Sequence, residues 1–265
     1  MAKKSNRYTL IIVDIFEKHF ISGEDGFVFE REELEHSAAK LAIKLPKNLG
    51  DVIYSFRYRA ALPDSIAKTA PEGKEWVIRP AGMGLYRFSL TKQSRIVPNP
   101  ALARIKIPDA TPGIIERHAF SDEQALLAKV RYNRLIDIFS GITCYSLQNH
   151  LRTTASELGQ VEVDELYVGV DKHGAQYVFP VQAKAGRDQI NVVQIEQDLA
   201  VCAEHFPHLV CRPIAVQFLK DRVIAIFECM LQDNAVVVVT ERHYELVRSS
   251  DISNEELLTY RAQRG

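Results

Sequence analysis

The sequence predicts an α/β (α+β) protein, in which a small helical domain precedes a larger domain with a mixed central β-sheet flanked by helices. Three observations lead to this prediction. Helix-period patterns and one hairpin occupy residues 7–90, a proline-rich stretch follows, and the remainder alternates between helical segments and strand-like runs. A chain of 265 residues is long enough to form two domains of these kinds.

The composition is that of an ordinary globular protein, with 46% apolar and 25% charged residues. No apolar run approaches the roughly 20 residues that span a bilayer. Asp14, Glu17 and Lys18 interrupt the first apolar run, which makes it a poor signal peptide. The 4 cysteines are scattered, as expected for a reduced protein. We therefore expect a cytoplasmic protein with no membrane partner.

The net charge of -1 conceals an uneven distribution of charge along the chain. Residues 1–120 hold 19 Lys and Arg against 14 Asp and Glu, whereas residues 121–265 hold 14 against 20. The excess is sharpest in residues 47–106, with 11 basic and 4 acidic side chains. A basic segment beside an acidic remainder indicates a nucleic-acid partner, although chance clustering on solvated faces also produces such a pattern.

The first domain is predicted to contain helices over residues 7–20, 31–45 and 48–59, since apolar residues recur there at helical spacing. A hairpin follows over residues 75–90, with its turn at 81–84, which contains two glycines.

Three helices followed by a hairpin resemble a winged helix-turn-helix in element order and charge. In that family the third helix enters the major groove and the hairpin wing touches the DNA backbone. The resemblance implies that residues 48–59 form the recognition helix and 76–90 the wing. The side chains it assigns to DNA binding are Asn48, Ser55, Arg57, Arg59, Arg79 and Arg87. The alternative is a helical cap that packs on the second domain and binds nothing.

A linker is expected over residues 96–120, because Pro98, Pro100, Pro108 and Pro112 break regular elements. The predicted domains are therefore residues 1–95 and 121–265.

The second domain is predicted to open with two helices, the first of them starting at a capping box formed by Ser121 and Gln124. The expected helices cover residues 122–139, 145–156 and 189–205. The expected strands are a hairpin within residues 161–184 and runs at 214–219, 223–231 and 235–246.

Polar residues occupy the predicted hairpin in an unusual way. Glu162 and Asp164 lie on one strand, and the apolar run that follows ends in Gln182 and Lys184. Side chains alternate across a strand, so the two members of each pair share a face. Because burying such groups is costly, we expect Asp164, Gln182 and Lys184 to converge for a function. A structural ion pair between Asp164 and Lys184 is the alternative.

An acid on one strand, followed after a hairpin by an apolar run that ends in acid-x-Lys, resembles the PD-(D/E)xK nuclease superfamily. Asp164 matches the first acid, and Gln182-Ala183-Lys184 matches the variant in which glutamine replaces the second acid. The resemblance covers residues 121–265, but only three positions carry its chemistry, and Val163 stands where the family has proline. It implies catalysis by Asp164, Gln182 and Lys184.

The same resemblance implies a divalent cation, Mg²⁺ or Mn²⁺. Gln182 brings no charge, so Asp164 would hold the cation with help from Glu162 or Glu123. Lys184 would stabilise charge that develops on the phosphate.

The predicted function is therefore a metal-dependent DNA endonuclease of restriction type, which would work as a homodimer in order to cut both strands. The rival hypothesis is a non-catalytic DNA-binding regulator with a degenerate nuclease fold. RNA or a branched junction is a third possible substrate.

Overall fold

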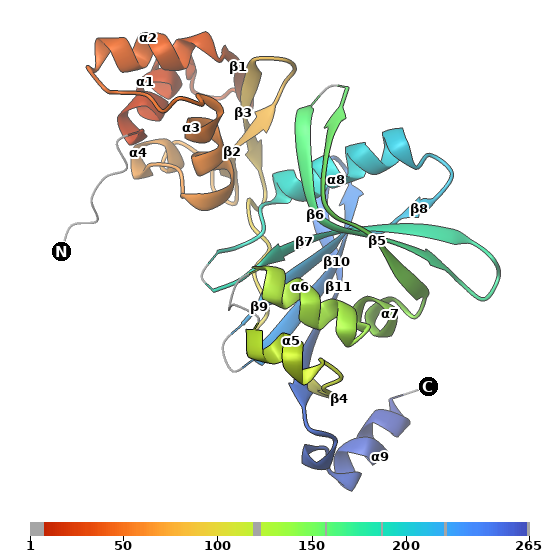
Figure 1. Ribbon diagram of the computed structural model, residues 1–265. Coiled ribbons are helices and arrows are strands. Elements are labelled where there is room, and N and C mark those ends of the chain that lie inside the picture. Colours follow the sequence, from red (N-terminus) through yellow and green to blue (C-terminus); the bar gives the residue numbers. More distant parts are fainter. Residues whose placement is uncertain (1–7, 119–122, 157, 187, 220–221, 264–265) are drawn as a thin grey trace.

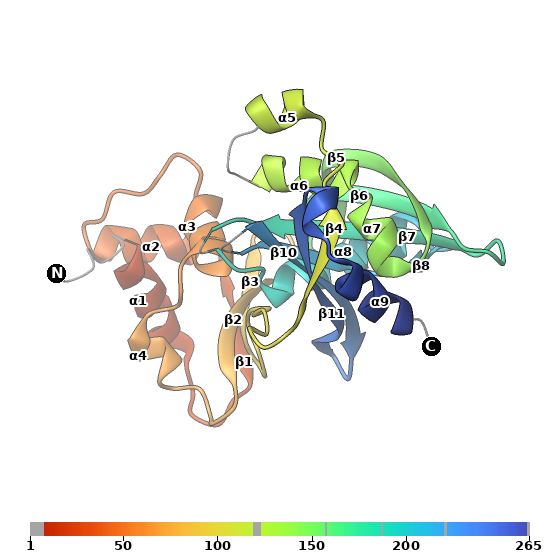
Figure 2. The same ribbon diagram turned by 90° about the horizontal axis from the view of Figure 1, so that it is seen from below.

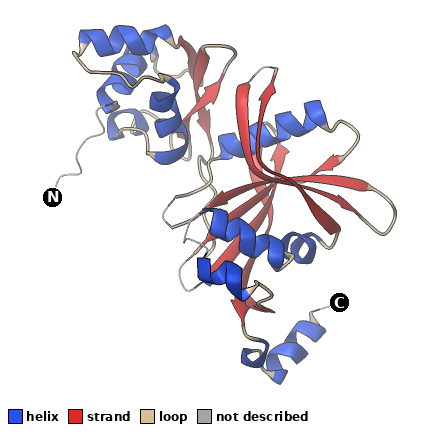
Figure 3. Ribbon diagram, viewed as in Figure 1, coloured by secondary structure: helices blue, strands red, loops and turns tan. Residues whose placement is uncertain are grey.

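The computed structural model describes residues 8–118, 123–156, 158–186, 188–219 and 222–263 (Figure 1). It confirms a mixed α/β fold, with a small helical body at the N-terminal end and a larger body built on a long sheet (Figure 3). Within the described residues, no helix combines the length and the apolar character needed to cross a bilayer.

The first body packs helices against a three-stranded antiparallel sheet of order β1-β3-β2. The helices pack through a core that includes Ile11, Phe16 and Phe88. Its elements are α1 (Thr9–His19), β1 (Gly26–Glu30), α2 (Glu32–Lys40), α3 (Gly50–Tyr54), the π-turn η1 (Ser55–Arg59), α4 (Asp64–Ala67), β2 (Glu75–Pro80) and β3 (Leu85–Thr91). The winged-helix assignment stays a prediction.

This body differs from the sequence-based expectation in several details. The helix expected over 31–45 ends at Lys40, and α4 covers residues for which no element was predicted. Residues 26–30, for which no element was predicted, form strand β1 along β3. The helix expected over 48–59 is an α-helix of only five residues that continues as a π-turn.

The larger body contains an eight-stranded mixed sheet within the described residues, in the order β4-β11-β10-β9-β7-β6-β5, with β8 beside β7. Helices α6 and α7 cover one face of this sheet and α8 covers the other (Figures 1 and 2). The elements are β4 (Arg104–Pro108), α5 (Gly113–His118), α6 (Glu123–Tyr132), α7 (Leu135–Ser140), β5 (Thr143–Ala155), β6 (Gly159–Val170), β7 (Gln176–Lys184), α8 (Val192–His205), β8 (Val210–Cys211), β9 (Ile214–Phe218), β10 (Val223–Gln232), β11 (Ala235–Val247), η3 (Ser249–Asp251) and α9 (Asn254–Ala262).

Three sequence-based expectations are wrong in the larger body. Residues 143–155 form the edge strand β5 instead of a helix over 145–156, because they pair along most of β6. The expected linker contains β4, which pairs in parallel with β11, and helix α5. The helix expected over 122–139 is two helices, since Arg134 adopts a left-handed conformation (φ 51°) between them. Ser121 of the predicted capping box lies outside the described residues.

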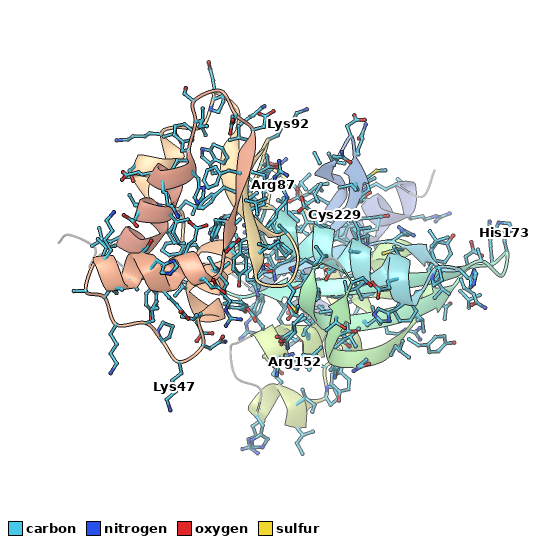
Figure 4. All side chains as sticks on the ribbon, turned by 90° about the horizontal axis from the view of Figure 1, so that it is seen from above. Lys47, Arg87, Lys92, Arg152, His173 and Cys229 are labelled. Carbon is cyan, nitrogen blue, oxygen red and sulfur yellow. The ribbon has the colours of Figure 1, made fainter. Side chains whose placement is uncertain are left out.

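The hairpin that carries the candidate residues forms as predicted. Asp171 accepts hydrogen bonds from the N–H groups of His173 and Ala175, and Gly174 supplies a positive φ of 85°. Strands β6 and β7 pair from Val170↔Gln176 to Glu165↔Val181. Beyond Glu165 they separate, and Asp164 lies at the point of separation. Figure 4 shows His173 at the far tip of the turn, distant from the first body.

Candidate active site between the two bodies

A cleft of about 1050 Å³ lies between the two bodies. On one side it is lined by the α3–η1 segment and the β2–β3 turn of the first body. On the other side it is lined by residues at the ends of β6 and β7 and on α6 and α8. The predicted site residues Asp164, Gln182 and Lys184 all line this one cleft. The structure therefore brings together the three positions that the family resemblance identified.

Lys184 is the centre of the polar contacts on this side. Its Nζ atom lies 3.0 Å from Oε1 of Glu123 on α6 and donates a second hydrogen bond of 3.0 Å to the Ala183 carbonyl oxygen. The Lys184 side chain is only 13% exposed. A lysine this buried needs an anionic partner, and Glu123 supplies it.

Asp164 is anchored from the neighbouring strand, because its Oδ2 accepts a 2.8 Å hydrogen bond from the Ala183 N–H. Burial raises the pKa of this carboxyl. Lys184 and the Ala183 N–H lower that pKa, while Glu123 raises it further. Asp164, Glu123 and Lys184 are therefore electrostatically coupled, as groups that share one site must be.

Gln182 has a more internal position than the sequence suggested. Its side chain is 1% exposed, and its Nε2 donates to Oδ1 of Asp198 (2.9 Å) and to the Glu162 carbonyl oxygen (3.1 Å). Its Oε1 accepts from Nε2 of Gln194 on α8 (2.9 Å). The amide is thus tied to helix α8 by both of its ends. This arrangement favours a positioning role for Gln182 over direct metal ligation.

Asp198 of α8, which the sequence reasoning missed, lies fully buried behind Gln182. Burial raises the pKa of Asp198 well above its usual value. The hydrogen bond from Gln182 opposes this rise, and the nearby Cys202 and Asp164 add to it. Burial therefore favours the protonated form of this carboxyl. The sequence gives little indication that Asp198 is buried, since an acidic residue on an amphipathic helix ordinarily faces solvent.

Glu162, the predicted second metal ligand, also lines the cleft but lies beside a histidine and an arginine. Its two carboxylate oxygens lie 3.5 Å from Nδ1 of His150 and 3.5 Å from Nε of Arg152, both on β5. Glu123 is the acid that contacts Lys184 and acts on Asp164. Of the two candidates left open by the sequence, Glu123 is therefore the better second carboxylate.

Two arginines that were predicted to bind DNA differ in their environments. Arg79 forms a bidentate ion pair with Glu196 of α8, at 2.8 and 2.7 Å, and also donates to Ser89. This guanidinium joins the two bodies, so we withdraw Arg79 from the predicted DNA contacts. Arg87 is exposed on β3, the middle strand of the first body's sheet (Figure 4). It is not among the described residues that line the cleft.

The remaining predicted DNA-binding residues belong to the α3–η1 segment. Asn48, Ser55 and Arg57 line the cleft. Asn48 caps the start of α3 through Asp51 and the Gly50 N–H. Arg57 donates to the Ile78 carbonyl oxygen. The side chain of Arg59 lies outside the described residues. The segment expected to read DNA thus faces the candidate active site.

The cation expected in this cleft is Mg²⁺ or Mn²⁺. Within the described residues, no group of three or more His, Cys, Asp or Glu side chains is arranged to hold a metal ion. Mg²⁺ does not require such a cage, because it keeps several waters and is commonly held by one or two carboxylates. Asp164 and Glu123, with the Ala183 carbonyl oxygen beside them, fit that requirement.

Comparison with known proteins identifies no relative: no family model, no curated protein and no solved structure matches this chain.

Proposed function

We propose that this protein is a metal-dependent endonuclease that hydrolyses phosphodiester bonds in the cleft between its two bodies. One observation supports this most strongly. Two carboxylates and an ammonium, from Glu123, Asp164 and Lys184, meet at the point where two strands separate. Asp164 and Lys184 are two of the three positions that the PD-(D/E)xK resemblance identified, and a segment of the basic first body lies opposite them.

Asp164 and Glu123 would hold Mg²⁺ or Mn²⁺, which when bound supplies Lewis acidity at the phosphate and an acidic water. The chain's own groups contribute the rest. Lys184 stabilises the negative charge that develops on the phosphate or orients the attacking water. The Ala183 N–H fixes the orientation of Asp164, and Gln182 ties the end of β7 to α8.

A non-catalytic nucleic-acid-binding regulator is the second candidate. The environment of Gln182 favours it, because this residue carries no charge and its amide is satisfied within the protein. In such a protein the Lys184–Glu123 pair would be purely structural. DNA as the partner, restriction-type selectivity and a two-fold dimer stay predictions under both candidates.

The test is to incubate the protein with supercoiled plasmid, single-stranded DNA and RNA in Mg²⁺ or Mn²⁺, and to map the ends of the products. We expect cleavage by the wild-type protein and much slower cleavage by Asp164→Asn. Asp233→Asn is the matched control, because Asp233 is exposed in the β10–β11 turn and its φ of 50° suits asparagine. Binding without cleavage on every substrate would favour the regulator.

A further inference from the structure

An aromatic wall lies across the cleft from the acidic and basic groups. Tyr54, Tyr58 and Tyr86 all line the cleft. The π-turn η1 brings the rings of Tyr54 and Tyr58 edge to face, with their centroids 4.9 Å apart. The Arg57 guanidinium lies 5.5 Å from the Tyr58 ring and 5.8 Å from the Tyr86 ring. Stacked aromatic rings and arginine are the groups on which proteins stack unpaired bases.

Tyr54 is 44% exposed, so part of this residue is open to solvent at the cleft. Tyr58 is more constrained, because its hydroxyl donates to Oε1 of Gln197 on α8 at 2.5 Å. Burial raises the pKa of Tyr58, which keeps the hydroxyl protonated as a donor. Tyr58 is therefore held in place by helix α8, whereas Tyr54 is partly exposed in the cleft.

Met83 lines the same cleft from the tip of the β2–β3 hairpin, and it is 99% exposed. It lies between Gly82 and Gly84, whose φ angles are 123° and 74°. Residues that carry a side chain rarely adopt such positive φ angles. The turn is held by hydrogen bonds between Ala81 and Leu85 and from the Arg31 N–H to the Gly84 carbonyl oxygen. Nucleic-acid-binding proteins insert exposed apolar side chains of this kind, methionine among them, between neighbouring bases.

The size of the cleft and the contacts between its walls bear on what it can bind. A volume of about 1050 Å³ matches the upper range of pockets that hold small ligands, roughly 300–1,000 Å³. Two contacts tie its walls together through helix α8: the Arg79–Glu196 pair and the Tyr58–Gln197 bond. A volume of this size suits a few unstacked nucleotides.

We propose that the cleft takes a nucleic-acid strand with at least one unpaired nucleotide beside the bond that is cut. Met83 enters between two bases, and the freed base stacks on Tyr54 opposite Asp164 and Lys184. This inference rests on the proposed function and specifies its substrate: single-stranded or locally unpaired nucleic acid instead of a regular duplex.

The test is binding by fluorescence anisotropy in Ca²⁺, with three oligonucleotides: a single strand, a fully paired duplex, and a duplex with a short unpaired loop. Ca²⁺ ligates carboxylates and is used in place of Mg²⁺ to separate binding from cleavage. We expect the wild-type protein to bind the single strand and the looped duplex at least tenfold more tightly than the paired duplex.

Three variants and two controls refine this test. Tyr54→Ala should weaken binding of the single strand by about 5- to 150-fold, the loss expected for one stacked base, and Tyr54→Phe should restore it. Met83→Ala should lower affinity for the looped duplex, and its folding should be unaffected because the side chain is exposed. Tyr145→Ala and Met230→Ala are matched controls, since both residues are exposed and neither is among the described residues that line the cleft.

The outcomes separate the two proposals. Equal or tighter binding of the paired duplex, with Tyr54→Ala and Met83→Ala unchanged, would overturn this inference while leaving cleavage, and hence the proposed function, intact. Absence of binding to every oligonucleotide, together with absence of cleavage in Mg²⁺, would overturn both.

Discussion

Lys184 of β7 and Glu123 of α6, which are 61 residues apart in the chain, place their Nζ and Oε1 atoms 3.0 Å apart at the mouth of the cleft. This contact joins the strand that carries Lys184 to a helix on the opposite face of the sheet from α8. Both charges act on the Asp164 carboxyl, since Lys184 lowers the pKa of this group and Glu123 raises it. The three groups therefore respond to one another, and the first prediction uses that coupling.

The pKa of Asp164 should move in opposite directions in two variants. Removing the ammonium in Lys184→Met should raise this pKa further, because a charge that lowers it is lost. Removing the carboxylate in Glu123→Gln should lower it, because a charge that raises it is lost. The titration of the Asp164 carboxyl, followed by ¹³C NMR in the absence of metal, measures both shifts. Shifts in the same direction would show that the three groups are not coupled as described.

Asp198 should make the protein less stable as pH rises. The folded state binds this proton more tightly than the unfolded state, because burial raises the folded-state pKa well above 3.8. The free energy of unfolding therefore falls as pH rises from the unfolded-state value through the raised folded-state value. Asp198→Asn should flatten this dependence in urea denaturation at a series of pH values. Asp233→Asn should keep the wild-type slope, and a wild-type slope in Asp198→Asn would contradict the argument.

Gln182 should not tolerate the acid that its family resemblance would normally place there. Gln182→Glu removes both amide donors and introduces a charge beside Asp198 and Asp164. We expect a loss of about 1–3 kcal/mol in the free energy of unfolding at neutral pH. Chemical denaturation measures the loss, with Gln176→Glu at the exposed start of β7 as the control. An unchanged stability would mean that this site accommodates a second acid.

The Arg79–Glu196 pair should hold the two bodies in one orientation. In a double-mutant cycle of Arg79→Ala and Glu196→Ala, the coupling energy should be about 1–3 kcal/mol, because the pair is bidentate and both side chains are about a fifth exposed. The Arg212–Glu228 pair has a similar geometry inside the second body. Disruption of the Arg79–Glu196 pair should split thermal unfolding into two transitions, whereas disruption of the Arg212–Glu228 pair should not. A single transition in both cases would show that other contacts fix the orientation.

Local sequence patterns predicted those elements whose neighbours are close in the chain. The β6–β7 hairpin formed as expected, because its turn chemistry at Asp171 and Gly174 is local. Strands β4 and β5 were missed for physical reasons. β4 exists because it pairs in parallel with β11, more than a hundred residues later, and β5 is an edge strand with a largely polar sequence. The partner of β4 cannot be read from the β4 segment, whereas β5 pairs with the strand that follows it and was missed because of its polar sequence.

The candidate site was only partly predictable for the same reason. The hairpin predicted that Asp164, Gln182 and Lys184 would converge, and all three residues line the cleft. The sequence left the choice between Glu123 and Glu162 open, since that choice depends on how α6 packs. It also could not show that Arg79 pairs with Glu196 or that Tyr54 faces the site, because both relationships join the two bodies.

The most direct test of the nuclease proposal is the single-turnover cleavage rate of Asp164→Asn, Lys184→Ala and their double variant. We expect each single change to lower the rate by roughly 10²–10³-fold, and the double variant to be little slower than the slower single variant, since the groups act as a unit. Lys172→Ala, in the exposed turn between β6 and β7, should cleave at the wild-type rate. Cleavage at the wild-type rate by the variant that combines Asp164→Asn and Lys184→Ala would contradict the proposal.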